Sequence, residues 1–302
     1  MKGIVLAAGK GTRLYPITLP VCKPLLPVYD KPLIYYSVST LMRAGIREIL
    51  IIVPPGEESA FQNLFGDGSS LGISIQYAEQ KEARGIADAF IVGEEFIGDD
   101  QVCLVLGDNI FFGPSFRQKL RSAIRILEGD PSDVNEPGGG AAIFGYYVND
   151  PRPFGVVEFD TDGKAISIEE KPQHPKSNYI VPGLYFYDND VIKIAKSIEP
   201  SARGELEITD VNNVYLQNDN LHVISLDEQY TWFDAGTADS LYEASGAIKA
   251  AQRSGKMIAC LEETAVHNHW ITIDELAARA EKMKKTKYGE YLYSIYDELT
   301  EL

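Results

Sequence analysis

The sequence predicts an α/β fold, because hydrophobic runs typical of buried strands alternate with amphipathic helical patterns along its first half. Residues 4–6, 48–53 and 101–106 are almost continuously apolar, as in parallel strands that are covered on both faces. Strands that alternate with helices in this way place helices on both sides of one sheet. We therefore expect a Rossmann-like, mixed but mostly parallel central sheet with helices on both faces, followed by a small helical C-terminal extension.

The first half of the chain contains the repeated strand and helix units. The helix predicted at residues 33–44 ends before Gly45, which suits the left-handed position that follows a helix. Ile34, Val38 and Leu41 fall on one face of that helix, so this face is expected to pack on the sheet. The other elements predicted here are strands at 73–78 and 101–106 and helices at 85–96 and 115–127.

The middle third of the chain is richer in strand-forming residues. Asp162-Gly163 is typical of a hairpin turn, so the runs on either side of it are expected to pair. Residues 130–140 contain two prolines and three consecutive glycines and are expected to form a loop. The predicted strands are 141–148, 155–160, 165–169, 179–187 and 221–226, the predicted helices are 190–198 and 205–216, and 230–235 is expected to lead to the site.

The chain becomes helical from about residue 237 onward. Thr272 and Glu275 form a capping-box pattern at the start of a helix that is expected at 272–285. Two more helices are predicted at 238–252 and 288–299. We expect residues 1–240 to form the core and residues 241–302 to form an extension that serves packing or subunit contacts.

Composition and charge limit the classes of function. The 302 residues are 45% hydrophobic and 24% charged, which is ordinary for a globular protein. The net charge of −16 disfavours nucleic-acid binding, and an anionic ligand would need cations held at its own site. Three widely separated cysteines argue against a disulfide framework. Neither a signal-peptide pattern nor a run of 18 apolar residues occurs, so we expect a cytoplasmic protein without membrane contact.

The opening of the chain predicts a phosphate-binding loop. Gly9 and Gly11 follow the first strand and let the backbone turn sharply, so that its N–H groups can surround phosphate oxygens. Arg13 adds a fixed positive charge with several donors. A Walker A loop is excluded because no Gly-Lys-Ser/Thr occurs, and the dinucleotide fingerprint fails at Leu14. An ordinary tight turn remains the alternative at this point.

Two single carboxylates follow apolar runs. Asp108 comes after the strand at 101–106, and Asp234 stands between an aromatic run and a glycine. Each alone could be a turn residue or a helix cap, but the two together also suit a Mg²⁺ ion whose other ligands are substrate phosphates and water. His267 and His269 have metal-like spacing but no third ligand nearby, so no zinc site is expected.

A further charged cluster precedes Pro172. Lys171 comes directly before this proline and is expected to be extended, so that it could project its charge to a phosphate. Glu170 could accept hydrogen bonds from sugar hydroxyls, although a solvated cluster at a strand end is the alternative. Residues 179–185 would form either an apolar wall for a sugar or part of the core, and Arg203 would either belong to a loop or reach a phosphate.

Together these segments resemble the signature of the sugar nucleotidyltransferases. The match includes the glycine loop with Arg13, the Lys-Pro-Leu-Leu-Pro-Val segment that begins at Lys23, and the Gly-Asp-Asn around Asp108. It continues in the family's order through residues 155–159, 169–172, 203–210 and 232–237. The set is most similar to the glucose-1-phosphate thymidylyltransferases, which make dTDP-glucose and pyrophosphate from dTTP and glucose 1-phosphate.

The resemblance implies a role for each matched position. The catalytic residues would be Arg13, Lys23, Asp108 and Lys171, and Mg²⁺ would be bound by Asp108 and Asp234. The nucleotide-binding residues would be Leu6, Ala8, Gly9, Gly11, Thr12, Arg13, Gln80, Gly85 and Asp108, of which Gln80 and Gly85 would contact the pyrimidine. The residues that bind the sugar phosphate would be Asn109, Gly155, Glu170, Lys171, Val181, Tyr185 and Arg203.

The family also implies a homotetramer, feedback by a dTDP-sugar, and a role in supplying dTDP-deoxysugars for cell-surface polysaccharides. The β-rich portion of residues 1–240 would hold the sugar. The chain departs from the family pattern at Ala8, where a glycine is commoner, and before Gly85, where a proline is usual. The second departure leaves undecided whether the pocket for the base is the same as in the family. The same reaction with UTP or another sugar phosphate, and a non-catalytic sugar-nucleotide sensor, remain alternatives.

Overall fold

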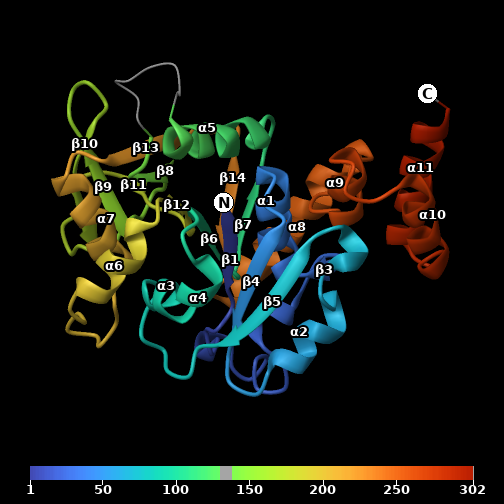
Figure 1. Ribbon diagram of the computed structural model, residues 1–302, viewed down its shortest axis with the longest axis horizontal. Helices are drawn as coiled ribbons and strands as arrows, with labels where there is room; N and C mark the ends of the chain where they lie inside the picture. Colours follow the sequence, from blue (N-terminus) through green and yellow to red (C-terminus); the bar gives the residue numbers. More distant parts are fainter. Residues whose placement is uncertain (130–137, 302) are drawn as a thin grey trace.

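The computed structural model describes residues 1–129 and 138–301, so most of the loop predicted at 130–140 lies outside the described residues. Its centre is a ten-stranded sheet in the order β10-β9-β11-β8-β12-β6-β1-β4-β5, with β13 paired to β8 (Figure 1). Four strands form the predicted parallel half, since β1 pairs with β4 and β6, and β4 pairs with β5. These strands are β1 (Lys2–Leu6), β4 (Glu48–Val53), β5 (Ser74–Glu79) and β6 (Val102–Leu106).

The other half of the sheet is mainly antiparallel. β12 (Leu184–Tyr187) joins the two halves, because it pairs with both β6 and β8 (Ala141–Tyr147). The hairpin predicted at Asp162-Gly163 is confirmed and is formed by β9 (Gly155–Phe159) and β10 (Ala165–Glu170). β11 (Tyr179–Ile180) pairs with β8 and β9, and β13 (Leu221–Leu226) runs parallel to β8.

The single strand predicted at 179–187 is wrong, because three residues, 181–183, separate β11 from β12. The N–H of Val181 donates to the carbonyl of Gly155 at 2.9 Å. Pro182 has no N–H to donate, which interrupts the ladder at this point. The interruption allows residues of this segment to line the cavity described below.

Helices cover both faces of the sheet, as predicted. Neighbouring strand residues point to opposite faces, and Val5 and Ile4 accordingly belong to different buried clusters. Gly45 ends α1 in the left-handed conformation with φ of 92°, also as predicted. The cluster of Val5 includes α1 (Ile34–Ala44) and α5 (Phe116–Glu128), and that of Ile4 includes α3 (Asp88–Val92), α6 (Asp190–Ser197) and α7 (Ile208–Gln217).

Several elements differ from the sequence prediction. The helix predicted at 85–96 is two short helices, α3 and α4 (Glu94–Ile97), which are separated at Gly93. α2 (Glu58–Phe65) and α9 (Leu261–His267) have no predicted counterpart. β7 (Asn109–Phe112) was also not expected, and it pairs with β14 (Thr231–Asp234) in a separate two-stranded ribbon. A second small ribbon is formed by β2 (Pro27–Val28) and β3 (Lys31–Pro32).

The C-terminal part is helical, as predicted, with α8 (Ala238–Ala251), α9, α10 (Ile273–Lys282) and α11 (Lys287–Thr300). α10 and α11 stand together at the end of the molecule opposite β9 and β10 (Figure 1). The capping box at α10 is confirmed, because Thr272 and Glu275 each accept a hydrogen bond from the backbone of the other. None of the described helices is both long and apolar enough to cross a membrane.

Candidate active site

The loop after β1 carries the predicted phosphate-binding glycines. The N–H of Ala7 still bonds the carbonyl of Ile52 at 2.8 Å, so the loop starts where the β1 ladder ends. Gly11 has φ of 61°, and a Cβ there would lie 3.0 Å from Cβ of Lys23, so both conformation and space favour glycine. Gly9 has neither a left-handed φ nor a close neighbour. The predicted sharp turn therefore depends on Gly11.

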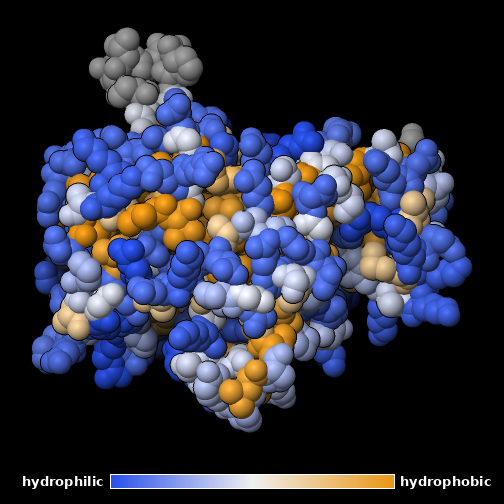
Figure 2. Space-filling view, turned by 60° about the horizontal axis from the view of Figure 1, so that its bottom comes forward, coloured by the Kyte–Doolittle hydropathy of each residue, from blue (hydrophilic) through white to orange (hydrophobic). Residues whose placement is uncertain are grey.

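The segment that follows this loop is exposed and apolar. Tyr15, Ile17 and Leu19 are between 46% and 67% exposed. Figure 2, which brings the lower edge of Figure 1 forward, shows hydrophobic residues on a projection at that edge. The hydroxyl of Thr18 donates to the carbonyl of Gly11 at 2.7 Å, so the segment is tied back to the glycine loop.

The β7–β14 ribbon brings the two predicted carboxylates together. Asn109 is paired with Asp234, and the N–H of Ala235 donates to the carbonyl of Asp108 at 3.0 Å. Asp108 also lies just beyond the carboxyl end of β6, the edge at which open α/β sheets bind ligands. The two side chains are 27% and 26% exposed, so both remain accessible.

Two cations stand beside these carboxylates. The ammonium of Lys23 is buried, donates a hydrogen bond to Oδ2 of Asp108 and lies 4.0 Å from Oδ1 of Asp234. The guanidinium of Arg13 packs on Gly236, where a Cβ would lie 2.8 Å from Nη2 of Arg13 and 3.2 Å from Oδ1 of Asp234. The structure thus brings four of the predicted site residues to one point.

The two carboxyl groups have opposite pKa shifts. Burial acts to raise the pKa of Asp108, but the charge and hydrogen bond of Lys23 outweigh it, so this pKa lies below its ordinary value. Burial and the charge of Asp108 raise the pKa of Asp234 to about 6, against the opposing effect of Lys23, Arg13 and Lys171. Both groups are therefore mainly ionised at neutral pH.

The pair of Asp108 and Asp234 fits the magnesium ion that the sequence predicts. Mg²⁺ prefers oxygen ligands and is commonly held by one or two carboxylates, with waters and substrate phosphates completing its shell. The ammonium of Lys23 already holds a positive charge between these carboxylates, so the position suits a cation. Within residues 1–129 and 138–301, no group of three His, Cys, Asp or Glu side chains could hold an ion. The other ligands would therefore come from substrate and water.

A cavity of about 300 Å³ opens beside this cluster. Ten predicted site residues line it: Arg13, Asp108, Asn109, Gly155, Glu170, Lys171, Val181, Tyr185, Arg203 and Asp234. Lys23 is joined to the cavity through its contact with Asp108. The predicted residues that do not line it are Lys23, Leu6, Ala8, Gly9, Gly11, Thr12, Gln80 and Gly85.

Glu170 is held in place on one side of this cavity. Its Oε2 accepts a hydrogen bond from the hydroxyl of Thr209 at 2.6 Å, and its Oε1 lies 3.3 Å from Nη2 of Arg203. Arg203 also donates to Glu207 at 2.8 Å, so carboxylates share its positive charge. Arg203 therefore helps to fix Glu170, and its contact with a phosphate stays a prediction.

The predicted extended conformation of Lys171 is wrong. Its φ is 46°, in the left-handed region, although it precedes a proline. Its N–H donates to the carbonyl of Phe154 at 3.0 Å, and this contact fixes the turn at the end of β10. A non-glycine residue in such a conformation costs roughly 1–3 kcal/mol, which the surrounding structure must offset. Lys171 nevertheless lines the cavity and lies 3.5 Å from Glu170.

Asn109 and Tyr185 form part of the cavity wall. Oδ1 of Asn109 accepts from the indole of Trp232 at 2.7 Å, and its Nδ2 donates to Asp108 at 2.9 Å. Asn109 thus positions the Asp108 carboxylate. Burial raises the pKa of Tyr185, so its hydroxyl stays neutral at the cavity wall.

Gln80 and Gly85 are the residues that the resemblance assigns to the pyrimidine. The amide of Gln80 is buried and donates to Asp88 at 2.9 Å and to the carbonyl of Gly85 at 3.3 Å. The structure joins the two residues to each other away from the cavity lining. Their contact with the base stays a prediction.

The cavity is also lined by residues that were not assigned to the site from the sequence. Phe154 and Trp232 pack edge to face there, with ring centroids 5.2 Å apart. Thr209 belongs to the 203–210 segment, so the family motif was the signal that could have found it. Asn212 lies one helical turn further along α7, and no motif indicates it.

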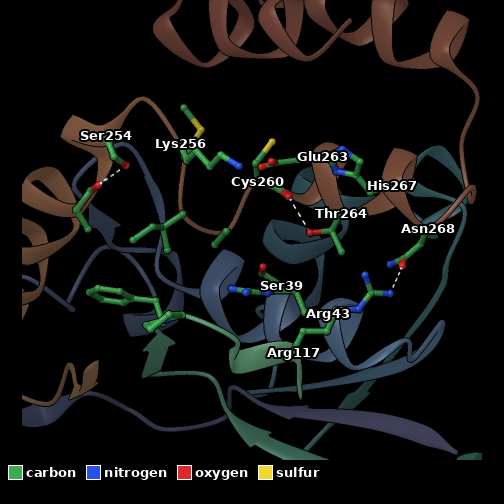
Figure 3. Close-up of a pocket in the computed structure, with 17 residues that line it drawn as sticks. Ser39, Arg43, Arg117, Ser254, Lys256, Cys260, Glu263, Thr264, His267 and Asn268 are labelled. Carbon is green, nitrogen blue, oxygen red and sulfur yellow. Dashed lines mark hydrogen bonds between the residues drawn. The ribbon is translucent and has the colours of Figure 1, made fainter. Parts of the chain in front are cut away.

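A larger cavity, of about 770 Å³, shares no lining residue with the first. Figure 3 shows Arg43 and Arg117 on one side of it, and Lys256, Glu263 and His267 on the other. Burial raises the pKa of Glu263 above its ordinary value. Three cations thus face a cavity that none of the predicted site residues lines.

The chain is similar to known proteins over nearly its whole length. Residues 2–251 match the family model described as nucleotidyl transferase. The glucose-1-phosphate thymidylyltransferase of Neisseria gonorrhoeae is 54% identical, over 97% of this chain and 98% of its own length. The enzyme of the same name from Mycolicibacterium smegmatis is 50% identical, over 98% of this chain and 99% of its own length.

Solved structures share the fold. A crystal structure of a protein from Bacillus anthracis in complex with a sucrose has a TM-score of 0.73 and 40% identity, and the match covers 82% of this chain and 94% of that one. A UDP-glucose pyrophosphorylase complexed with UDP-glucose has a TM-score of 0.69, covering 83% of this chain and 98% of that one, but at 24% identity it shows the fold alone. Given these identities and this coverage, the chain belongs to the glucose-1-phosphate thymidylyltransferase family of nucleotidyltransferases.

Proposed function

We propose that this chain transfers the thymidylyl group of dTTP to α-D-glucose 1-phosphate, giving dTDP-glucose and pyrophosphate. The observation that carries the proposal is the meeting of Arg13, Lys23 and the carboxylates of Asp108 and Asp234 beside one cavity. The names of relatives at 54% and 50% identity support the choice of the two substrates.

The reaction needs positioning and charge stabilisation more than proton transfer. The second pKa of a phosphate monoester is about 6, so glucose 1-phosphate is largely a dianion at pH 7. One of its phosphate oxygens attacks the α-phosphorus of dTTP in line, and the bond from that phosphorus to the pyrophosphate oxygen breaks. No side chain has to remove a proton from the nucleophile. The catalytic task is to hold two polyanions together and to stabilise the charge of the transition state.

The cations of the site suit this task. The glycine loop and Arg13 would hold the phosphates of the nucleotide, because the loop offers N–H groups and the guanidinium offers paired donors. Lys23 would add positive charge for the phosphates beside Asp108, to which its ammonium donates a hydrogen bond. Lys171 would contact the sugar phosphate, since its backbone turn directs it to the cavity beside Glu170.

Asp108 and Asp234 would hold Mg²⁺, which when bound supplies positive charge at the reacting phosphate. Asn109 and Lys23 both donate to Asp108, so that carboxylate stays ionised and fixed in direction. Among the residues that the structure describes, the nearest ion-pair partner of Asp234 is Lys23, at 4.0 Å, so this carboxylate is held less closely than Asp108. Asp234 is therefore the carboxylate that is freer to adjust to an ion.

The remaining proposals concern assembly and regulation. We propose a cytoplasmic homotetramer in which residues 241–302 form the extension that serves packing and subunit contacts. The larger cavity is the candidate for feedback by a dTDP-sugar, because Arg43, Arg117 and Lys256 offer positive charge for a diphosphate. Its lining is separate from that of the catalytic cavity, as a regulatory site requires.

A pyrophosphate-release assay with dTTP, glucose 1-phosphate and Mg²⁺ tests the proposed reaction. We expect release that depends on all three components, and no release would favour a non-catalytic sugar-nucleotide sensor. Parallel initial rates with UTP separate the two nucleotides. The thymine methyl can favour dTTP over UTP by only about 1–3 kcal/mol in transition-state free energy, so some activity with UTP is expected. A higher kcat/KM for UTP than for dTTP would overturn the nucleotide assignment.

A further inference from the structure

One buried amide on α7 is only half satisfied. Asn212 is 1% exposed, and its Oδ1 accepts a hydrogen bond from the hydroxyl of Tyr187 at 2.5 Å. Its Nδ2 is the single buried side-chain nitrogen or oxygen, among the residues that the structure describes, with no hydrogen-bond partner. A buried donor without a partner loses its hydration with no hydrogen bond in exchange, so its presence calls for a physical reason.

Packing alone does not require an amide at this position. The neighbouring buried residues of α7, Val211 and Tyr215, belong to the apolar cluster on this face of the sheet. Leucine has the same branched arrangement of four side-chain heavy atoms, but it could not accept from the buried hydroxyl of Tyr187, so Oδ1 of Asn212 has a structural role. The hydrogen bonds of the described residues give no such role to Nδ2. Rotating the amide of Asn212 would only exchange the idle donor for an idle acceptor. The side chain therefore keeps one free hydrogen-bonding atom in either orientation.

Asn212 faces the cavity of the active site. Thr209 and Asn212 are three residues apart on α7 and so lie on the same side of the helix, and both line the cavity. The hydroxyl of Thr209 is used by Glu170, at 2.6 Å. The Oε1 of Glu170 is approached by Arg203 at 3.3 Å. The polar groups next to Asn212 are thus already paired, whereas its own Nδ2 is free for a ligand atom.

We propose that Asn212 is a sugar-recognition residue, whose side-chain amide hydrogen-bonds one hydroxyl of the glucosyl unit when glucose 1-phosphate binds. The proposal rests on the proposed function, because it assigns a ligand to the same cavity. A sugar hydroxyl both donates and accepts, so it can satisfy the amide in either orientation. Tyr187 fixes the opposite end of the amide, so that the free atom is presented in one direction.

The test combines a variant of Asn212 with sugar phosphates that each lack one hydroxyl. The kcat/KM of pyrophosphate release is measured with glucose 1-phosphate and with its 2-, 3-, 4- and 6-deoxy analogues. In Asn212→Leu we expect kcat/KM for glucose 1-phosphate to fall about tenfold, mainly through KM, since a net hydrogen bond is worth roughly 0.5–1.5 kcal/mol. For one deoxy analogue the variant and the parent protein should have equal kcat/KM, because that substrate lacks the hydroxyl that the amide binds.

Asn213→Leu is the matched control. Asn213 is the adjacent residue on α7, its amide donates to the carbonyl of Ile168 at 3.3 Å, and it does not line the cavity. Its substitution should leave the ratios among the five sugar phosphates unchanged. Asn212→Ala serves as a second variant if the leucine does not fold, and the same loss of discrimination is expected.

A uniform effect on all five substrates would overturn the proposal, since a structural role, or an internal water on the amide, predicts no selectivity. An unchanged kcat/KM in Asn212→Leu would overturn it as well. These results are distinct from failure of the proposed function. In that case the parent protein itself would release no pyrophosphate from dTTP and glucose 1-phosphate.

Discussion

The ammonium of Lys23 donates a hydrogen bond to the carboxylate of Asp108 across 85 positions of the chain. The same ammonium lies 4.0 Å from Asp234, so one buried cation links the segment after β1 with the carboxylate just before β7 and the carboxylate at the end of β14. Breaking a buried pair leaves the other charge uncompensated, which is costly. This contact therefore ties the phosphate loop to the proposed magnesium site.

The first prediction concerns Arg13 and Asp108. Arg13→Ala or Asp108→Ala should each lower kcat by on the order of 10²–10³, by analogy with the loss of one donor that stabilises transition-state charge. Steady-state pyrophosphate release measures the loss, and circular dichroism checks that the fold is intact. Arg121→Ala is the control, because Arg121 is an exposed residue of α5 that does not line the cavity. Near-normal turnover in either site variant would contradict the assignment.

The second prediction concerns pH and the metal. Burial and the charge of Asp108 raise the pKa of Asp234 to about 6, so a proton competes with a metal ion below that pH. The affinity for Mn²⁺, used in place of Mg²⁺, should be nearly constant above pH 7 and should fall about tenfold for each pH unit below 6. Titration of the protein alone, followed by electron paramagnetic resonance, measures this affinity without substrate phosphates that titrate in the same range.

Asp234→Asn is the matched control for this experiment. The amide does not titrate, so the variant should bind Mn²⁺ weakly at every pH from 5 to 7.5. Asp108 should not add a second step in this range, because Lys23 keeps its pKa below the ordinary value. A parent protein whose affinity stays flat through pH 6 would refute the role of Asp234.

The third prediction concerns the glycine beside Arg13. In Gly236→Ala the added Cβ would stand 2.8 Å from Nη2 of Arg13, so the guanidinium must move. Because the guanidinium ends a flexible side chain, the cost in stability should be small, whereas kcat/KM for dTTP should fall about tenfold. A misplacement of about 1 Å in a group that positions a substrate can lower the rate of reaction by up to about a hundredfold.

Gly246→Ala provides the comparison for that variant. Gly246 lies inside α8 with nothing within 4 Å of an added Cβ. The alanine should raise stability by about 0.5–1 kcal/mol, because it lowers the entropy of the unfolded chain, and should leave kinetics unchanged. Equal kinetics for the two alanine variants would show that Arg13 does not need its present position.

The fourth prediction concerns the C-terminal helices. Glu262 of α9 is 2% exposed and accepts hydrogen bonds from Nε and Nη2 of Arg279 on α10, at 3.0 and 2.8 Å. Arg279→Met should lower the free energy of unfolding by about 3–5 kcal/mol, since it leaves a buried charge without its partner. Urea unfolding measures the change. Adding Glu262→Leu to this variant should restore part of the stability, and a double variant no more stable than Arg279→Met would disprove the account.

The sequence allowed the parallel half of the sheet to be predicted because its strands are short apolar runs with clear ends. β4 was predicted with its observed bounds, Glu48–Val53, and Gly45 marked the end of α1. β7 could not be found in this way. Asn109–Phe112 follows β6 after only two residues, and its conformation depends on pairing with β14 far along the chain. Local patterns carry no information on such a partner.

The site was predictable in its residues but not in its contacts. The resemblance supplied ten of the residues that line the cavity, although it could not show that Lys23 pairs with Asp108. The rule for residues before proline failed at Lys171, because a tertiary hydrogen bond to Phe154 outweighs the local preference. Asn212 could not be singled out, since only the folded structure reveals that its amide lacks a partner.

The cavity takes its walls from three different parts of the chain: the segment after β1, the β7–β14 ribbon, and the β9–β12 region with the start of α7. A substitution on α7 can therefore alter which sugar fits without disturbing the cations and carboxylates where the phosphates react. Such a division makes the molecule a practical starting point for engineering. Other sugar phosphates could be accommodated by changing the wall near α7, while the two walls that carry the reacting groups are retained.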